Sequence, residues 1–236
     1  MLLRRRLFEA VHPARLATYP QAIAELPTID LGCGPHKRRG AIGLDIEPGP
    51  GIDHVVDFER EPLPFADGAV GYVYSSHCLE HLRQPMPVMK ELTRVAADGA
   101  GLEIWLPYGF HNEGQLVDHY VLWNEEQFMH ISALFPQIWA ERLGGGWWEL
   151  DELVFHVEEN TLNELIRHGD ALPYALKFYR NVVRELGILG HIRKGPPEQA
   201  RKVVPKRTFV VTRNQDVRRP VEPVGLLDRA KSILRR

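Results

Sequence analysis

The sequence predicts a doubly wound α/β fold, in which a mostly parallel sheet carries helices on both faces. The first observation is a short apolar strand around Asp30 that leads into two closely spaced glycines, Gly32 and Gly34. The second is a series of further apolar segments, separated by helical or loop stretches, that ends in a strong strand at residues 102–107. Strands that alternate with other elements in this way form parallel β-α units. The ligand of such a fold lies outside the carboxyl ends of its strands.

Composition and charge are ordinary for a globular protein. The chain has 236 residues, of which 44% are hydrophobic and 25% charged, and its net charge is −2. We therefore expect no strong field that would attract nucleic acid or a membrane surface. The arginine-rich start lacks the apolar core of a secretory signal, and no stretch approaches the roughly 20 apolar residues of a membrane helix. Because Cys33 and Cys78 both fall in predicted site motifs, we expect reduced thiols and a cytoplasmic location.

The first half of the chain contains most of the predicted sheet. Apolar runs predict strands, and amphipathic spacing predicts helices. The predicted strands lie near residues 28–31, 41–44, 54–57, 70–74 and 102–107, and the predicted helices at 78–82 and 86–96, with a turn at 97–101.

The second half is less regular. It contains a long loop at residues 108–121, a helix at 124–135, a strand at 147–157, helices between 158 and 187, and a last strand at 206–213. Together with the five strands of the first half, the sequence predicts seven strands. We divide the chain into an N-terminal helical extension (1–26), a main domain (27–215, with an insertion at about 158–200) and a tail (216–236) with an amphipathic helix.

Carboxylates stand at the ends of the first three predicted strands. Asp30 precedes the glycine turn, Asp45 ends the second strand, and Asp57 ends the third. A dinucleotide fingerprint would need a third glycine where Lys37 stands, and Asp30 would repel a pyrophosphate. A carboxylate such as Asp45 suits a ribose diol, since it accepts two hydrogen bonds. Alone, Asp45 or Asp57 is as well explained as a loop cap; together, behind the glycine turn, they indicate a cationic, ribose-bearing ligand.

The string Asp-Leu-Gly-Cys-Gly at residues 30–34, followed by Gly-Leu-Asp at 43–45, resembles the first two motifs of the class I methyltransferases that use S-adenosylmethionine. The resemblance covers residues 27–107 and implies a Rossmann-like fold. It implies cofactor contacts from the glycine turn, from the ends of the second and third strands, and from the tip of the fourth: Asp30, Gly32, Cys33, Gly34, Asp45, Ile46, Asp57, Phe58 and Ser76. For Cys33 we prefer a structural interpretation, in which the cysteine serves only as a small apolar residue in a tight turn.

The segment His77-Cys78-Leu79-Glu80-His81 is the most informative for chemistry. On a helix, His77, Glu80 and His81 would share one face beside the methyl donor. An imidazole could act as a general base that Glu80 orients, or the three could bind a divalent metal that lowers the pKa of the acceptor. The metal interpretation resembles the Glu-x-x-Glu-His motif of certain O-methyltransferases, although His77 replaces its first glutamate. A third interpretation is purely structural, with Glu80 at a helix N-terminus.

We prefer an acceptor-side role for His77 and His81 without metal, because the motif is incomplete. A metal would need His119 or His111 from the loop after the fifth strand, and His119 is the further candidate for acceptor contact.

These residues predict an enzyme that transfers the methyl group of S-adenosylmethionine to a hydroxyl of a small molecule such as a sugar. A divalent metal is possible but not favoured, and we expect no nucleic-acid partner. One alternative is a methyltransferase-like protein that binds the cofactor without transfer. The other is a nicotinamide-dependent oxidoreductase, against which Lys37 and Asp30 argue.

Overall fold

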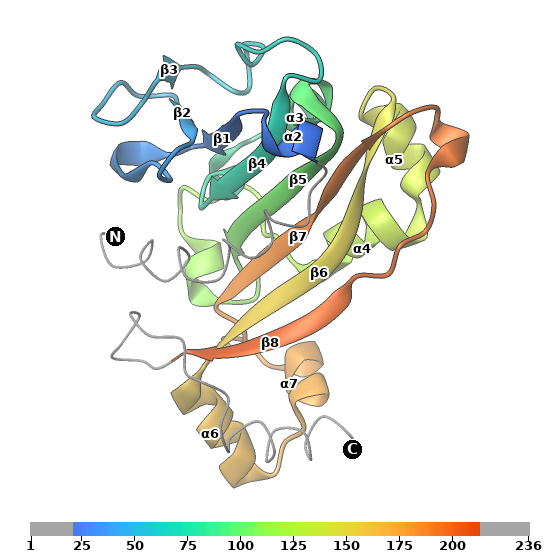
Figure 1. Cartoon of the computed structure of the whole chain (residues 1–236). Helices are drawn as coiled ribbons and strands as arrows, with labels where there is room; N and C mark the ends of the chain where they lie inside the picture. The colour runs from blue at the N-terminus through green and yellow to red at the C-terminus, as the bar shows by residue number, and fades with distance from the viewer. Residues whose placement is uncertain (1–20, 213–236) are drawn as a thin grey trace.

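The computed structural model describes residues 21–212, and these form one eight-stranded sheet (Figure 1). The strand order is β3-β2-β1-β4-β5-β7-β6-β8. The expectations for residues 1–20 and for the amphipathic tail lie outside the described residues.

The sheet is parallel in its first half and mixed in its second. The parallel strands are β1 (Thr28–Leu31), β2 (Ile42–Asp45), β3 (His54–Val55), β4 (Val70–Ser76) and β5 (Ala96–Pro107). β7 (Glu185–Lys194) runs antiparallel to both β5 and β6 (Gly146–Glu158), and β8 (Lys206–Thr212) runs parallel to β6. The predicted fold class is thus confirmed, with eight strands instead of seven.

The additional strand is β7, which falls inside the expected insertion at about 158–200. It pairs with β5 from Ala100↔Ile192 to Pro107↔Glu185 and with β6 on its other side, so this part of the chain belongs to the interior of the sheet. Two glycines interrupt its apolar pattern. A Cβ at Gly187 would lie 2.4 Å from the Trp105 ring, and one at Gly190 would lie 2.2 Å from the Glu149 carbonyl oxygen. Neighbouring groups therefore leave no room for a side chain at these two positions, and β7 lacks there the apolar residues that usually identify a strand in a sequence.

The helices lie on both faces of the sheet and beyond one end of it. They are α2 (Gln21–Ala24), α3 (Pro85–Val95), α4 (Glu125–Met129), α5 (Pro136–Arg142), α6 (Glu159–His168) and α7 (Leu172–Phe178). In Figure 1, α2 lies in front of the sheet, α3 to α5 lie behind it, and α6 and α7 lie beyond β8 at the bottom. From residue 21 to residue 212, no helix is long and apolar enough to cross a bilayer.

Two local expectations were wrong. Residues 97–101 do not turn the chain but belong to β5, which begins at Ala96 directly after α3. The helix expected at 78–82 is a single 3-10 turn, η3 (Leu79–His81). The residue before this segment, His77, has a φ of +54°, a left-handed conformation that a continuous helix does not contain.

The sheet places the ends of its parallel strands side by side. Leu31 at the end of β1 pairs with Leu44 of β2 and Ser75 of β4, and Ser76 pairs with Trp105 of β5. The connection from β1 to β2 contains only a 3-10 turn, η2 (Gly34–His36), where parallel strands usually need a crossover of a dozen or more residues. This carboxyl edge lies toward the left of Figure 1.

Candidate functional site

The glycine turn after β1 needs both of its glycines, for different reasons. Gly32 and Gly34 have φ values of +66° and +51°, which residues with a side chain rarely adopt. A Cβ at Gly32 would stand 2.4 Å from the Cβ and Sγ of Cys78, whereas no atom lies within 4 Å of a Cβ built at Gly34. Gly32 is therefore required for packing, and the space above Gly34 is open.

Cys33 lies between these glycines and is 1% exposed. Its amide donates to the Leu44 carbonyl over 3.0 Å. Cys33 and Cys78 are both free thiols. These observations agree with Cys33 as a small apolar residue that fixes the turn.

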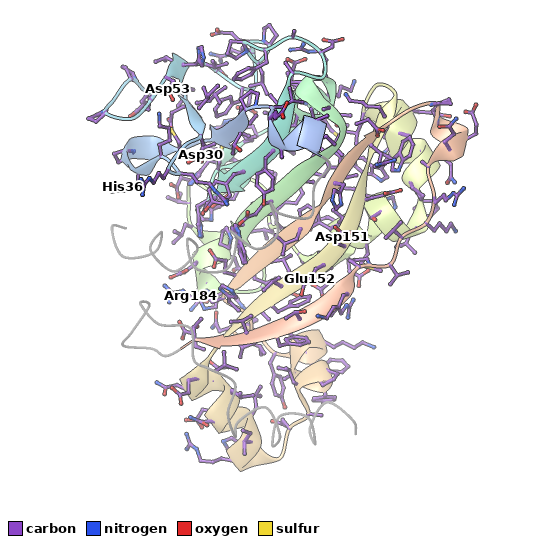
Figure 2. All side chains as sticks on the ribbon, in the orientation of Figure 1. Asp30, His36, Asp53, Asp151, Glu152 and Arg184 are labelled. Atoms are coloured by element: carbon purple, nitrogen blue, oxygen red, sulfur yellow. The ribbon has the colours of Figure 1, made fainter. Side chains whose placement is uncertain are left out.

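Carboxylates hold the turn at its two ends. Asp45 Oδ2, at the end of β2, accepts a hydrogen bond from the Gly34 amide over 2.7 Å. Asp30 is fully buried, and its Oδ2 accepts from the Arg38 amide over 2.6 Å. Figure 2 labels Asp30 and His36 at this edge. The conformation that presents the open space at Gly34 is thus set by Asp30 and Asp45.

A third carboxylate beside the turn escaped sequence analysis. Asp53 Oδ2 accepts from the Gly43 amide over 2.7 Å and pairs with Lys37 Nζ at 2.5 Å. These hydrogen bonds lower the pKa of Asp53, the one from Lys37 most. Asp53 joins the turn to the loop before β3 (Figure 2).

The cofactor contacts expected at the ends of the second and third strands, Ile46, Asp57 and Phe58, do not point into one common space. Ile46 follows β2 and is 57% exposed, whereas Phe58 is 6% exposed and packs in the main core. Asp57 Oδ1 accepts from the Glu59 amide, and its Oδ2 pairs with Arg60 at 3.3 Å. Asp57 therefore caps its own loop, as the structural alternative expects.

A pocket of about 340 Å³ opens at the carboxyl edge. The glycine turn, the tip of β4 and η3 line one side, and the loop after β5 lines the other. Of the predicted site residues, it brings together Gly32, Cys33, Gly34, Ser76, His77, Glu80, His81 and His119. Asp30, Asp45, Ile46, Asp57 and Phe58 do not line it. Glu113, Leu116 and Asp118 of the loop line it without having been predicted.

His77 lies between two carboxylates. Its Nε2 is 2.7 Å from Glu185 Oε1, and its Nδ1 is 3.3 Å from Glu80 Oε1. Burial would lower the pKa of His77, but interactions with Glu185 and Glu80 outweigh it and raise the pKa to about 10. The imidazole is therefore a cation at neutral pH, with both nitrogens protonated. A protonated imidazole cannot accept a proton, so this environment does not favour the general-base interpretation, and the role of His77 stays a prediction.

Glu185 is the partner that sequence analysis missed. It begins β7, the strand that was not recognised, and it also pairs with His156 of β6 through Oε2 at 3.0 Å. Burial would raise the pKa of Glu185, but hydrogen bonds from His156 and His77 hold it well below its usual range. The Glu185 carboxylate thus anchors His77 from behind the pocket.

Glu80, His81 and His119 form a second group in the pocket. Their potential ligand atoms all lie within 4.8 Å of one another. The rings of His81 and His119 meet edge to face with centroids 4.7 Å apart. The amides of Tyr120 and Val121 donate to the Glu80 carbonyl over 2.8 and 3.4 Å, which attaches the loop to η3. His119 consequently reaches the pocket, as expected from the loop's position.

The other loop histidine, His111, has a different place. It is the N-cap of the 3-10 turn η4 (Asn112–Gln115), and its Nδ1 accepts from the Glu113 amide over 3.1 Å. It does not line the pocket. Of the two loop histidines, only His119 therefore lines the pocket.

A buried brace supports the glycine turn from the middle of the sheet. Glu103 of β5 is fully buried and accepts hydrogen bonds from Arg38 (2.9 Å), Tyr72 (2.6 Å) and Trp105 (2.8 Å). The Arg38 guanidinium also lies over the Tyr74 ring, 4.6 Å from its centroid. Because the Arg38 amide binds Asp30, this residue connects the turn to the sheet interior.

Comparison with known proteins agrees with this geometry. Residues 41–102 match the family model of a methyltransferase domain. An uncharacterized methyltransferase of Mycolicibacterium gilvum is 33% identical over 128 residues, which are 44% of this chain and 49% of that protein. Ajmaline N-methyltransferase of Rauvolfia serpentina is 39% identical over 57 residues, 23% of this chain and 20% of that protein. The matches to these curated relatives span about half of their length or less.

Among solved structures, a SAM-dependent methyltransferase from Archaeoglobus fulgidus shares the fold. It aligns with a TM-score of 0.51 at 18% identity over 75% of this chain and 91% of its own. The share of this chain that aligns with that structure is larger than the part matched by the family model.

Proposed function

We propose that this chain, a member of the class I methyltransferases, transfers the methyl group of S-adenosylmethionine to a hydroxyl group of a small molecule. The observation that carries the proposal is one pocket that joins the glycine turn to an imidazole- and carboxylate-lined wall. Donor and acceptor would thus occupy adjacent parts of the same space, and holding two reactants in line is the main contribution of such an enzyme.

The residues of the turn fit the donor. The space above Gly34 is open, and Ser76 lines the pocket where β4 ends. Asp45 at the tip of β2 carries an oxygen, Oδ1, that accepts from the Glu47 amide over a long 3.3 Å, so it is available to a ribose diol. Ile46 is exposed beside it and suits contact with a purine ring. We propose that Asp57 and Phe58 contact the adenine ring of the cofactor. Asp57 would then give up its hydrogen bond from the Glu59 amide and bind the adenine amino group instead.

The same turn supports a cationic ligand over a pyrophosphate. A dinucleotide usually places its phosphates at the N-terminus of a helix that follows the glycine turn. Here a single 3-10 turn, Gly34–His36, stands in that position, and two carboxylates, Asp30 and Asp45, flank it. These features argue against the nicotinamide-dependent alternative.

The acceptor side supports transfer to oxygen. S-adenosylmethionine supplies an electrophilic methyl group on a sulfonium. The reaction forms one oxygen–carbon bond, leaves the electron pair of the broken carbon–sulfur bond on sulfur, and releases the hydroxyl proton. Glu80, His81 and His119 surround the place where an acceptor hydroxyl would enter. His77, held as a cation, adds positive charge that would favour an acceptor oxygen as it loses its proton.

The pocket size favours a small acceptor. A volume of about 340 Å³ lies at the low end of ligand pockets, which span roughly 300–1,000 Å³. Polar side chains on the acceptor wall suit a polyol such as a sugar. Two buried free thiols support a reducing compartment such as the cytoplasm.

The test begins with binding. S-adenosylhomocysteine, S-adenosylmethionine, NAD and NADP are each titrated calorimetrically and in a thermal-shift assay, since a bound ligand stabilises the folded state by mass action. We expect S-adenosylhomocysteine and S-adenosylmethionine to bind and the two nicotinamide dinucleotides not to bind. Binding of NAD or NADP without binding of the S-adenosyl compounds would support the oxidoreductase.

Turnover is then measured with radiolabelled donor on a panel of sugars and other hydroxyl compounds, with amines in parallel. Transfer to a hydroxyl compound supports the proposal. Transfer to amines alone would refute O-methylation, and donor binding with no transfer on either panel would favour the non-enzymatic alternative.

A further inference from the structure

We infer that Glu80, His81 and His119 bind a divalent transition-metal ion on the acceptor side of the pocket. The inference deepens the proposed function and rests on it for the role of the ion, but binding itself can be tested separately. The three residues offer one carboxylate and two imidazoles whose potential ligand atoms lie within 4.8 Å of one another. This replaces the metal-free role that we preferred from the sequence.

The first argument is that buried acceptor atoms of this group lack hydrogen bonds. Glu80 is fully buried, and neither of its side-chain oxygens accepts a hydrogen bond from the residues that the structure describes. The Nδ1 atom of His77 is 3.3 Å from Oε1 without hydrogen-bond geometry. The Nδ1 atom of His119 is likewise buried without a hydrogen bond in the described part of the chain. Buried polar atoms are nearly always satisfied, so these atoms indicate a ligand between them.

The second argument is the tautomer of His81. Its Nδ1 lies 3.0 Å from the Asp118 carbonyl oxygen, which can only accept, so Nδ1 carries the proton. The lone pair of the neutral ring is then on Nε2. A metal-binding histidine usually donates its other ring N–H to a carbonyl or carboxylate in this way, which fixes the ring and raises its basicity.

The third argument is that the loop after β5 brings its ligand to a fixed place. The amides of Tyr120 and Val121, the two residues directly after His119, both donate to the Glu80 carbonyl. The backbone of one proposed ligand, Glu80, therefore positions another, His119. Two ligands from distant parts of the sequence are held together without the ion, as a preformed site requires.

The donor set indicates the class of ion. Two imidazoles and one carboxylate suit Mn²⁺, Fe²⁺, Co²⁺ or Zn²⁺, whereas Mg²⁺ and Ca²⁺ prefer oxygen ligands alone. Metal–nitrogen and metal–oxygen bonds of about 2.0–2.2 Å place two ligand atoms up to about 4.2 Å apart. Small side-chain rotations would bring the three residues to that spacing. Three protein ligands leave coordination positions toward the pocket, where an acceptor hydroxyl could bind and lose its proton to water more readily.

The test measures metal binding by the whole chain, residues 1–236. The protein is treated with a chelator, dialysed, and titrated with Mn²⁺ and with Zn²⁺, with binding followed by calorimetry and by the electron paramagnetic resonance of free Mn²⁺. We expect one ion per chain. Mg²⁺ is the comparison and should bind more weakly.

Variants identify the ligands. His119→Ala and His81→Ala should each weaken binding by more than the roughly 10–100-fold that loss of an outer-shell partner costs. The matched control is His168→Ala, which removes an imidazole that is exposed on α6, away from the pocket, and should bind the ion as the unmodified protein does. Circular dichroism and S-adenosylhomocysteine affinity verify that each variant is folded.

The outcomes separate this inference from the proposed function. Stoichiometric Mn²⁺ or Zn²⁺ binding that both pocket variants lose supports the inference. Absence of binding at millimolar ion, or equal binding by the His119→Ala and His168→Ala variants, overturns it. If S-adenosylhomocysteine binds while the metals do not, the inference alone fails. If the metals bind at this site and S-adenosylhomocysteine does not, the proposed function fails and the metal site stands.

Discussion

Replacing Glu103 by glutamine should destabilise the fold strongly, although the two side chains have nearly the same shape. The buried carboxylate accepts hydrogen bonds from Arg38 and Tyr72 at Oε2 and from Trp105 at Oε1. An amide has one accepting oxygen and one donating nitrogen. In either orientation, its nitrogen would therefore face at least one of these donors.

The magnitude follows from two terms. A buried donor left without an acceptor costs about 1–3 kcal/mol. Breaking a buried ion pair by removing one partner costs about 3–5 kcal/mol, and the Arg38 side chain is only 20% exposed. The amide oxygen of the glutamine can still accept a hydrogen bond from some of these donors. We therefore expect the free energy of unfolding to fall by about 3 kcal/mol, at the low end of the range for a broken ion pair. For a chain of this size, that loss lowers Tm by about 6–12 °C.

Urea denaturation followed by circular dichroism gives the free energy, and a thermal scan gives Tm. The control is Glu164→Gln, which removes an exposed ion pair with Arg167 on α6 and should cost less than about 1 kcal/mol. A Glu103→Gln loss no larger than that of the control would refute the reasoning, because the carboxylate would then contribute no more than a surface charge.

Three further predictions concern the site and its surroundings. Asp45→Ala should weaken S-adenosylhomocysteine binding by about 1.5–3 kcal/mol, the worth of a charged hydrogen bond, and an unchanged Kd in calorimetry would remove Asp45 from the site. Gly32→Ala should lower Tm, because the new Cβ would lie 2.4 Å from the Cys78 side chain. Gly34→Ala should lower Tm less, because no atom lies near its Cβ, and should mainly weaken ligand binding. Equal losses of Tm in the two variants would contradict this difference. A hydrogen bond from Arg94 lowers the pKa of Glu91, so its stabilisation is present above the ordinary pKa of 4.5 and is lost as pH falls through the lower folded value. The stability difference between the unmodified protein and Glu91→Gln should therefore shrink on acidification, and a constant difference in urea denaturation would exclude this linkage.

The parts of the fold that sequence analysis predicted are those whose pattern is local. β1, β2 and α3 follow from apolar runs and helical spacing, and the glycine turn follows from a backbone that needs positive φ at Gly32 and Gly34. The acids at the ends of the first two strands were expected to lie at the carboxyl edge, and Asp30 of β1 and Asp45 of β2 do.

The parts that sequence analysis missed depend on tertiary contacts. β7 lacked a strand pattern because Gly187 and Gly190 make room for Trp105 and for the backbone of β6. The environment of His77 depends on Glu185, 108 positions away in sequence, so the local motif could not reveal that Nε2 of this imidazole pairs with a carboxylate of β7. The choice of His119 over His111 likewise depends on how the loop attaches to Glu80.

The contact between Gly187 and Trp105 has a consequence for evolution. The two residues lie opposite each other on adjacent antiparallel strands, and the indole occupies the volume that any side chain at position 187 would need. In homologous sequences, we expect a residue larger than glycine at this position only where the tryptophan has been replaced by something smaller. Because Trp105 also donates a hydrogen bond to Glu103, replacing the tryptophan would change the buried brace. We therefore expect positions 103, 105 and 187 to be substituted together in homologous sequences or to be conserved together.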